Sequence, residues 1–259
     1  MVRSSSSALL LTLALLTTVP LLSNQTQQVT KPLVPDPSAS AADLEEQGDL
    51  LRARKQYLDA IDFYNAAKAK QPTPLLWNKE GMAYLLMQRI PEASKCFDQA
   101  IKLDKKAPEG YNNRGYIEQR KENYDKAIKY YRKAIAIRPN DAVFHYNMGS
   151  SYFGKKNYTR AAQEYRAAYT LDPDIFERVS KTGVMAQSTS PENRATFSFL
   201  IARMYAQAGD LDRSLEYLRK AMEEGYKNIK QVYTDAEFAS LREDKRFAEL
   251  MAQKPQAIQ

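Results

Sequence analysis

The chain has 259 residues and a formal net charge of +7, from 38 basic and 31 acidic residues. It holds one cysteine, Cys96, and one histidine, His145, which excludes an intramolecular disulfide and leaves too few ligands for a conventional zinc site. Only nine glycines occur, and the abundance of alanine, lysine, leucine and tyrosine is typical of packed amphipathic helices.

The N-terminal segment 1–23 resembles a secretory signal. Arg3 supplies positive charge, and the largely apolar run from Ala8 to Leu22 is too short for a membrane span, which takes about 20 residues. Because the cleavage site is poorly defined, an uncleaved membrane anchor is the alternative to removal. We expect a periplasmic or secreted protein, with no membrane insertion beyond such an anchor. Residues 24–41 are rich in Pro, Ser, Thr and Gln and are predicted to form a flexible linker.

From position 42 onward, small and aromatic residues recur at a nearly fixed interval. Each unit reads as two amphipathic helices joined by a short polar turn. The glycines are Gly48, Gly81, Gly115 and Gly149, the first alanines Ala60, Ala93, Ala127 and Ala161, and the aromatics Tyr64, Phe97, Tyr131 and Tyr165. A period of about 34 residues with two helices per unit indicates a solenoid, in which each unit contacts only its neighbours.

The small residues have a packing role, because they let helix backbones approach while the aromatic side chains fill the gaps. Replacing Gly115 with leucine is therefore predicted to overpack this contact and to destabilise the protein by ~1–3 kcal/mol. Cys96 is predicted to be a small core residue, and His145 is expected to have a packing role.

The period breaks after position 173. Residues 174–191 are predicted to form an irregular insert with a short helix that turns Ile175, Phe176 and Val179 inward. A fifth, divergent unit follows, with Ala202 in place of the glycine. The pattern changes again from Tyr226, where a terminal cap is expected because the last unit of a solenoid needs an outer face that tolerates water.

The spacing W-x-x-x-G-x-x-Y, then A-x-x-x-F/Y-x-x-A and a closing proline, resembles the tetratricopeptide repeat, and four consecutive units match it. The resemblance implies an all-α fold, a right-handed α-solenoid of about five tetratricopeptide helix pairs with a C-terminal helical cap. The expected organisation is a signal peptide (1–23), a linker (24–41), four repeats (42–173), the insert (174–191), the fifth repeat (192–226), the cap (227–253) and a tail (254–259).

The resemblance also implies a concave groove lined by the first helix of each unit. Its outward positions give the candidate peptide-binding residues Asn78, Asn112, Asn113, Tyr116, Gln119, Tyr146, Asn147, Ser150 and Arg203. Carboxamides donate and accept hydrogen bonds at once, which suits the main chain of an extended peptide. The alternative is that these amides only solvate the groove. Glu45 and Asp49 stand where some family members clamp a terminal carboxylate, and they would repel one.

No Gly-rich phosphate loop, H-E-x-x-H or G-x-S-x-G motif occurs, so we expect no enzyme, no cofactor and no metal site. The leading hypothesis is a non-enzymatic scaffold that binds a protein or peptide segment in the concave groove; nucleic acid is not an expected partner. The alternative is an architectural component of a cell-envelope or secreted complex that acts through its convex basic face. The stretch 102–138 holds eleven Lys and Arg against five Asp and Glu.

Overall fold

A computed structural model of the chain describes residues 33–182 and 190–253. The predicted signal peptide, the first half of the linker (24–32) and the C-terminal tail lie outside the described residues. The chain divides into two units between Leu33 and Val34, and the helices of the described residues belong to the second unit.

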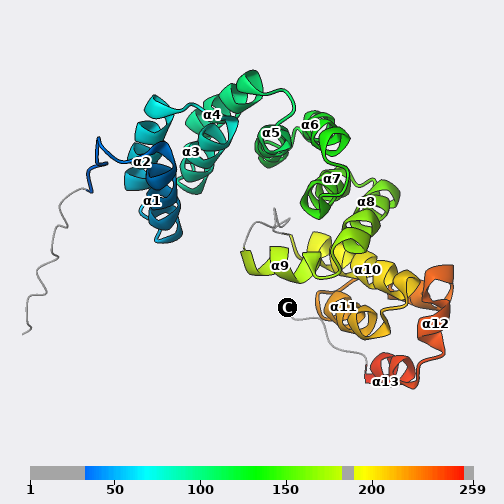
Figure 1. Ribbon diagram of the computed structural model, residues 1–259. Helices are drawn as coiled ribbons and strands as arrows, with labels where there is room; N and C mark the ends of the chain where they lie inside the picture. The colour runs from blue at the N-terminus through cyan, green and yellow to red at the C-terminus, as the bar shows by residue number, and fades with distance from the viewer. Residues whose placement is uncertain (1–32, 183–189, 254–259) are drawn as a thin grey trace, which may run out of the picture. The chain divides into compact units, whose positions relative to one another are not determined.

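Eight helices form four consecutive pairs in the first part of this unit (Figure 1). Three residues join the two helices of each pair, and the second of the three has a left-handed backbone, with φ between 59° and 63°. The pairs are α1 Ala41–Ala53 with α2 Tyr57–Lys70, α3 Pro74–Leu86 with α4 Ile90–Leu103, α5 Pro108–Arg120 with α6 Tyr124–Ile137, and α7 Ala142–Gly154 with α8 Tyr158–Leu171. The same tight turn therefore recurs in every pair.

The remaining elements are helical as well. They are α9 Ile175–Thr182, α10 Pro191–Ala208, α11 Leu211–Glu223, the 3-10 helices η1 Ile229–Tyr233 and η2 Ala236–Phe238, α12 Ala239–Arg242 and α13 Lys245–Gln253. No strand occurs over residues 33–182 and 190–253. Over the same ranges no helix is both long enough and apolar enough to cross a membrane.

The helix pairs contact one another in sequence order. Within each pair the two helices pack together, and the second helix then packs on the first helix of the following pair, as α2 does on α3 and α6 on α7. The first helices also contact each other, α1 with α3, α3 with α5 and α5 with α7. The prediction of an all-α solenoid of about five helix pairs with a C-terminal helical cap is confirmed.

The repeated glycines bring the two helices of a pair into close contact. A Cβ atom added at Gly115 would lie 2.7 Å from the ring of Tyr131, and the equivalent glycines of the other three pairs face the equivalent aromatic ring in the same way. The alanines in phase, such as Ala127 and Ala134, are fully buried. These contacts confirm the close packing that the spacing predicts.

The fifth pair, α10 and α11, keeps this contact with different residues. Ala202 and Ser214 replace the glycine and the alanine, both are fully buried, and the Ser214 hydroxyl donates to the Ala202 carbonyl at 2.9 Å. Gly209 ends α10 with a left-handed φ of 82°, and the Asp210 side chain caps the start of α11. Glycine suits the left-handed C-cap and aspartate suits the N-cap, so these two residues form the turn between α10 and α11.

Two further elements complete the core. The helix α9 packs on α7 and α8 and buries Ile175 and Phe176, as predicted for the insert; the side chain of Val179 lies outside the described residues. At the C-terminus, α12 and α13 pack on α11, and Phe238, Leu241, Phe247 and Leu250 are buried there. The cap thus covers a face of α11 that would otherwise be exposed.

Candidate functional site

Four asparagines from three first helices form a continuous chain of hydrogen bonds, here named the asparagine ladder. Nδ2 of Asn147 in α7 donates to Oδ1 of Asn112 in α5 at 2.9 Å. Asn112 donates to its neighbour Asn113 at 3.2 Å, and Asn113 donates to Asn78 in α3 at 2.8 Å. The structure therefore brings together four of the predicted site residues.

The ladder follows a simple rule of register. The sixth residue of one unit donates to the fifth residue of the unit before it, which holds for Asn113 with Asn78 and for Asn147 with Asn112. Lys79 occupies the sixth position of the second unit and contacts Glu45, the fifth residue of the first, at 2.5 Å. The same contact between neighbouring units therefore occurs three times. It is an ion pair between the first and second units and an amide–amide hydrogen bond between the second and third and between the third and fourth.

The four asparagines differ in exposure. Asn112 and Asn147 are only 9% and 8% exposed, whereas Asn78 and Asn113 are half-buried. A carboxamide has two N–H donors and an oxygen with two lone pairs, and the ladder bonds use a part of this capacity. Asn78 and Asn113 therefore keep hydrogen-bonding groups that a ligand can reach.

Two other predicted residues make contacts between helices. Gln119 is 7% exposed, and its Oε1 accepts from the Tyr131 hydroxyl at 2.9 Å and from the Ser151 hydroxyl at 3.0 Å. Ser150 donates to the Tyr146 carbonyl at 3.1 Å and accepts from the Tyr165 hydroxyl at 3.2 Å. The structure gives both residues a role in holding the helices, and whether they also touch a ligand stays a prediction.

The two predicted tyrosines differ from each other. Tyr116 lies one helical turn after Asn112, is half-buried, and packs against the cluster of Leu85, Ala93, Phe97 and Ile117. Tyr146 is 4% exposed because Phe176 of α9 packs edge-on against it, with ring centroids 5.7 Å apart. Tyr116 is therefore accessible beside the ladder, whereas α9 covers Tyr146.

Arg203 belongs to a different part of the structure. It lies in α10 and contacts Asp235 at 3.6 Å and Glu237 at 3.9 Å, both of which belong to the C-terminal cap. The ladder asparagines make no ion pair or hydrogen bond with it in the described residues, and its predicted place in the groove stays a prediction. Its ion pairs fix the cap to the fifth helix pair.

The charges at the first unit are paired with one another. Lys79 contacts Glu45 and Asp49, each at 2.5 Å, and Asp49 also accepts from the Tyr64 hydroxyl at 2.8 Å. Partial burial would raise the pKa of Asp49, but the bonds from Lys79 and Tyr64 hold that pKa below its usual value. The carboxylates that were expected to repel a peptide terminus are thus shared with Lys79.

The surface of α3 and α5 around the accessible amides is here named the ladder face. It consists of Asn78, Asn113 and the large apolar or aromatic residues of α3 and α5 one helical turn from Asn78 or Asn112, which are Leu75, Met82 and Tyr116, together with Leu86 one turn further on. The outward positions of the second unit included Met82 in the sequence prediction, but the prediction missed Leu75 and Leu86. The equal intervals from Asn78 to Asn113 and from Asn112 to Asn147 were a visible signal of the ladder itself.

The groups most often used in catalysis occupy structural positions. Cys96 is buried and donates to Glu80 at 3.3 Å, and burial together with the Glu80 carboxylate raises the pKa of the thiol to about 12. Nδ1 of His145 lies 2.8 Å from Glu164 and its Nε2 lies 3.1 Å from the Pro139 carbonyl, so polar contacts hold the ring. In the described part of the chain no cluster of His, Cys, Asp or Glu could hold a metal ion.

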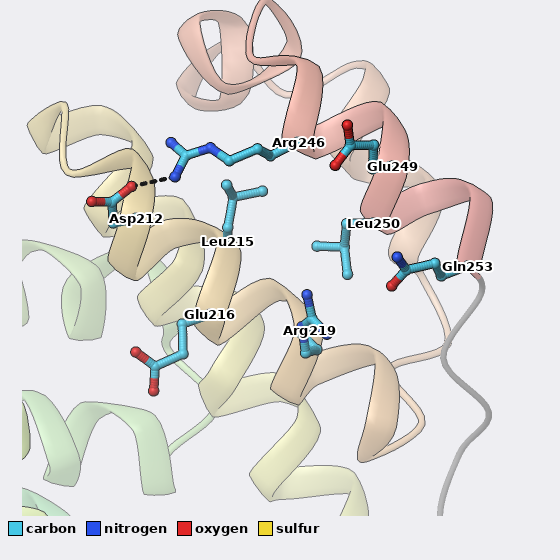
Figure 2. A pocket seen from close by; sticks show the side chains of 8 residues that line it. All are labelled: Asp212, Leu215, Glu216, Arg219, Arg246, Glu249, Leu250 and Gln253. Carbon is cyan, nitrogen blue, oxygen red and sulfur yellow. Dashed lines mark hydrogen bonds and ion pairs between the residues drawn. The ribbon is translucent and has the colours of Figure 1, made fainter.

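A surface depression of about 500 Å³ lies between α11 and the cap helix α13 (Figure 2). Its wall contains Leu215 and Leu250 and charged residues of both signs, and Arg246 pairs with Asp212 at 2.6 Å across it. Arg246 also pairs with Asp244 at 2.6 Å. These pairs account for the depression as the junction between the fifth pair and the cap.

Family models match four stretches of the sequence. They are models of the tetratricopeptide repeat at residues 108–141, 142–175 and 195–224, and a model named TPR repeat at residues 81–121. The chain contains tetratricopeptide repeats. The three matches between positions 81 and 175 include the asparagines of α5 and α7, so most of the ladder belongs to tetratricopeptide repeats.

Several solved tetratricopeptide structures are similar to the chain. The tetratricopeptide protein TTC0263 of Thermus thermophilus is 19% identical, covers 82% of this chain and 100% of its own, and has a TM-score of 0.49. MamA from residue 41 on, from Desulfovibrio magneticus RS-1, is 16% identical, with coverages of 78% and 100% and a TM-score of 0.49. The first tetratricopeptide domain of Spaghetti (RPAP3), bound to an HSP90 peptide, is 21% identical, with coverages of 45% and 94% and a TM-score of 0.42. No curated protein matches the sequence.

Proposed function

We propose that this tetratricopeptide chain is a non-enzymatic scaffold for protein–protein interaction, which binds an extended peptide segment on the ladder face. The observation that carries the proposal is the asparagine ladder, which sets amides at one register on three successive first helices. The accessible amides of Asn78 and Asn113 are the groups assigned to the ligand.

The chemistry of an extended peptide matches these amides. Its main chain presents one N–H and one C=O per residue, and these groups need partners when they leave water. A carboxamide can satisfy both kinds of group, and each net hydrogen bond is worth roughly 0.5–1.5 kcal/mol. Two amides and the flat surface of Tyr116 would give affinity for a segment without demanding one particular sequence.

The alternative role, as an architectural component acting through a basic face, has less support. Lys102, Lys105, Lys106, Lys121 and Lys129 are exposed, and none of them makes an ion pair within residues 33–182 and 190–253. Lys102 lies in α4 and Lys129 in α6. Lys105 and Lys106 lie between α4 and α5, and Lys121 lies between α5 and α6. A surface that recognises an acidic partner would gather its charges on one face.

The place of action is proposed from the N-terminal sequence. We propose export to the periplasm or the medium, because the segment 1–23 resembles a secretory signal. Fractionation of cells that make the full chain, or a chain lacking this segment, tests the proposal. Export through the signal requires that the shortened chain stays in the cytoplasm, and equal fractionation of the two chains would contradict it.

The test of peptide binding uses a displayed library of random peptides, selected on the folded protein. Selected sequences are synthesised with a fluorescent label, and their dissociation constants are measured by anisotropy. Replacing Asn78 and Asn113 together with alanine should weaken binding about tenfold, as the loss of one or two hydrogen bonds implies. Asn65→Ala is the matched control, since Asn65 is exposed on the second helix α2. A folded ladder variant that binds as tightly as the wild type would contradict the proposal.

A further inference from the structure

Two leucines of α3 are exposed on the ladder face. Leu75 is 50% exposed and Leu86 is 48% exposed, although a leucine side chain is more stable away from water. Leu75 lies one helical turn before Asn78 and Leu86 two turns after it, so helical periodicity puts them on the same side of α3 as this amide. Met82 lies between them on that side and is half-buried.

The equivalent positions of the neighbouring first helices carry different side chains. The second, fifth, ninth and thirteenth residues of each unit are Ala42, Glu45, Asp49 and Ala53 in α1, Leu75, Asn78, Met82 and Leu86 in α3, Glu109, Asn112, Tyr116 and Arg120 in α5, and Val143, Tyr146, Ser150 and Gly154 in α7. Of these four helices, α3 is the one with a large apolar side chain on both sides of its amide. The apolar part of the ladder face is therefore centred on the second unit.

The charged residues of α3 are paired with partners of opposite sign. Lys79 is the charged residue of this helix nearest to Asn78, and Glu45 and Asp49 both neutralise it. The other charged residue of α3, Glu80, is buried and pairs with Lys68. Tyr116 of α5 and Met82 of α3 pack against one common cluster, so the apolar surface continues from α3 to α5.

We propose that the segment recognised by the ladder face is uncharged where it crosses α3 and carries large apolar side chains there. This inference rests on the proposed function. Successive side chains of an extended peptide point to opposite sides of its main chain, and alternate ones are about 6.6–6.8 Å apart. With the main chain bonded to Asn78 and Asn113, side chains on one side reach Leu75 and those on the other reach Met82 and Leu86. A charged side chain at these places would lose its hydration, and both charged residues of α3 already have partners.

The test compares the wild type with a double leucine variant in the same library selection. We expect uncharged peptides rich in Leu, Ile, Phe or Met. Binding to Leu75→Lys/Leu86→Lys should be about tenfold weaker, because the variant loses the apolar contacts that the two exposed leucines make with the peptide. Leu58→Lys is the matched control, because Leu58 is 60% exposed on the second helix α2 and its variant should bind normally.

The remaining outcomes separate the two proposals. One outcome overturns this inference and leaves the proposed function in place. In that outcome the selected peptides lose affinity for the Asn78 and Asn113 variant, but they are charged or bind the double leucine variant as tightly as the wild type. A selection that yields no peptide overturns both. Circular dichroism of each variant shows whether it is folded, and these exposed positions can accept lysine without a change in the core.

Discussion

Replacing Gly115 with leucine would force a side chain into a space that the Tyr131 ring already fills. A Cβ atom alone would lie 2.7 Å from this ring, and ordinary contact begins near 3.4 Å. The ring cannot easily move, since Tyr131 is fully buried and its hydroxyl is bonded to Gln119, which also accepts from Ser151. The strain therefore spreads to α5, α6 and α7 together.

The magnitude follows from opposing effects. Overpacking costs ~1–3 kcal/mol, and losing the Tyr131 hydrogen bond adds ~1 kcal/mol. Leucine has a higher helix propensity than glycine, which stabilises the variant by ~1 kcal/mol and offsets a part of this loss. We expect a net loss of about 2 kcal/mol in the free energy of unfolding, which lowers the melting temperature by roughly 4–8 °C in a chain of this size.

Urea unfolding followed by circular dichroism measures this effect. The matched control is Gly154→Leu, where a Cβ atom would lie 2.4 Å from the Tyr124 ring. Tyr124 is half-buried, so its ring can turn toward solvent, and the control should lose much less stability. An unchanged midpoint for Gly115→Leu, or an equal loss in both variants, would refute the reasoning.

Three other predictions follow from buried or paired groups. Cys96 should resist iodoacetamide in the folded protein and react after unfolding, because it is buried and the pKa of its thiol is raised to about 12; modification at equal rates would contradict this. Glu80→Gln should destabilise the protein by ~3–5 kcal/mol in thermal unfolding, since it leaves Lys68 buried without its partner, and Lys68→Met added to it should restore part of the loss. Because the pKa of Asp49 is lowered in the folded state, its contribution to stability is present above about pH 4, near the unfolded pKa, and is lost as the pH falls further. Asp49→Asn should therefore flatten the acid limb of a stability–pH curve, and an unchanged limb would be evidence against this role.

The helix pairs were predictable from the sequence because one contact recurs four times. Gly115 against Tyr131, and its equivalents, leave a period in the residue types that packing alone can explain. The conformation of the turns was not predictable. Lys55, Gln88, Glu122 and Lys156 have left-handed φ values although none of them is glycine or asparagine. The packing of the two helices imposes this backbone, and the local sequence carries no sign of it.

The sequence predicted which side of each first helix the candidate site residues lie on, but it did not predict which of them are exposed. The spacing of Asn112, Tyr116 and Gln119 places them on one side of a helix, but it does not show which of them a neighbouring helix covers. Gln119 is buried by its bonds to α6 and α7, and Tyr146 is covered by Phe176 of the irregular insert. Such contacts join residues far apart in the chain, so a period within one unit cannot reveal them.

The most direct test of peptide binding at the ladder face observes the amides themselves. Side-chain amide resonances of the asparagines, assigned by single alanine variants, are followed by NMR while a peptide from the library selection is added. We expect the signals of Asn78 and Asn113 to shift in proportion to the bound fraction, while that of Asn65 on α2 stays in place. If the peptide binds and the two ladder signals do not move, the ladder face is not the binding surface.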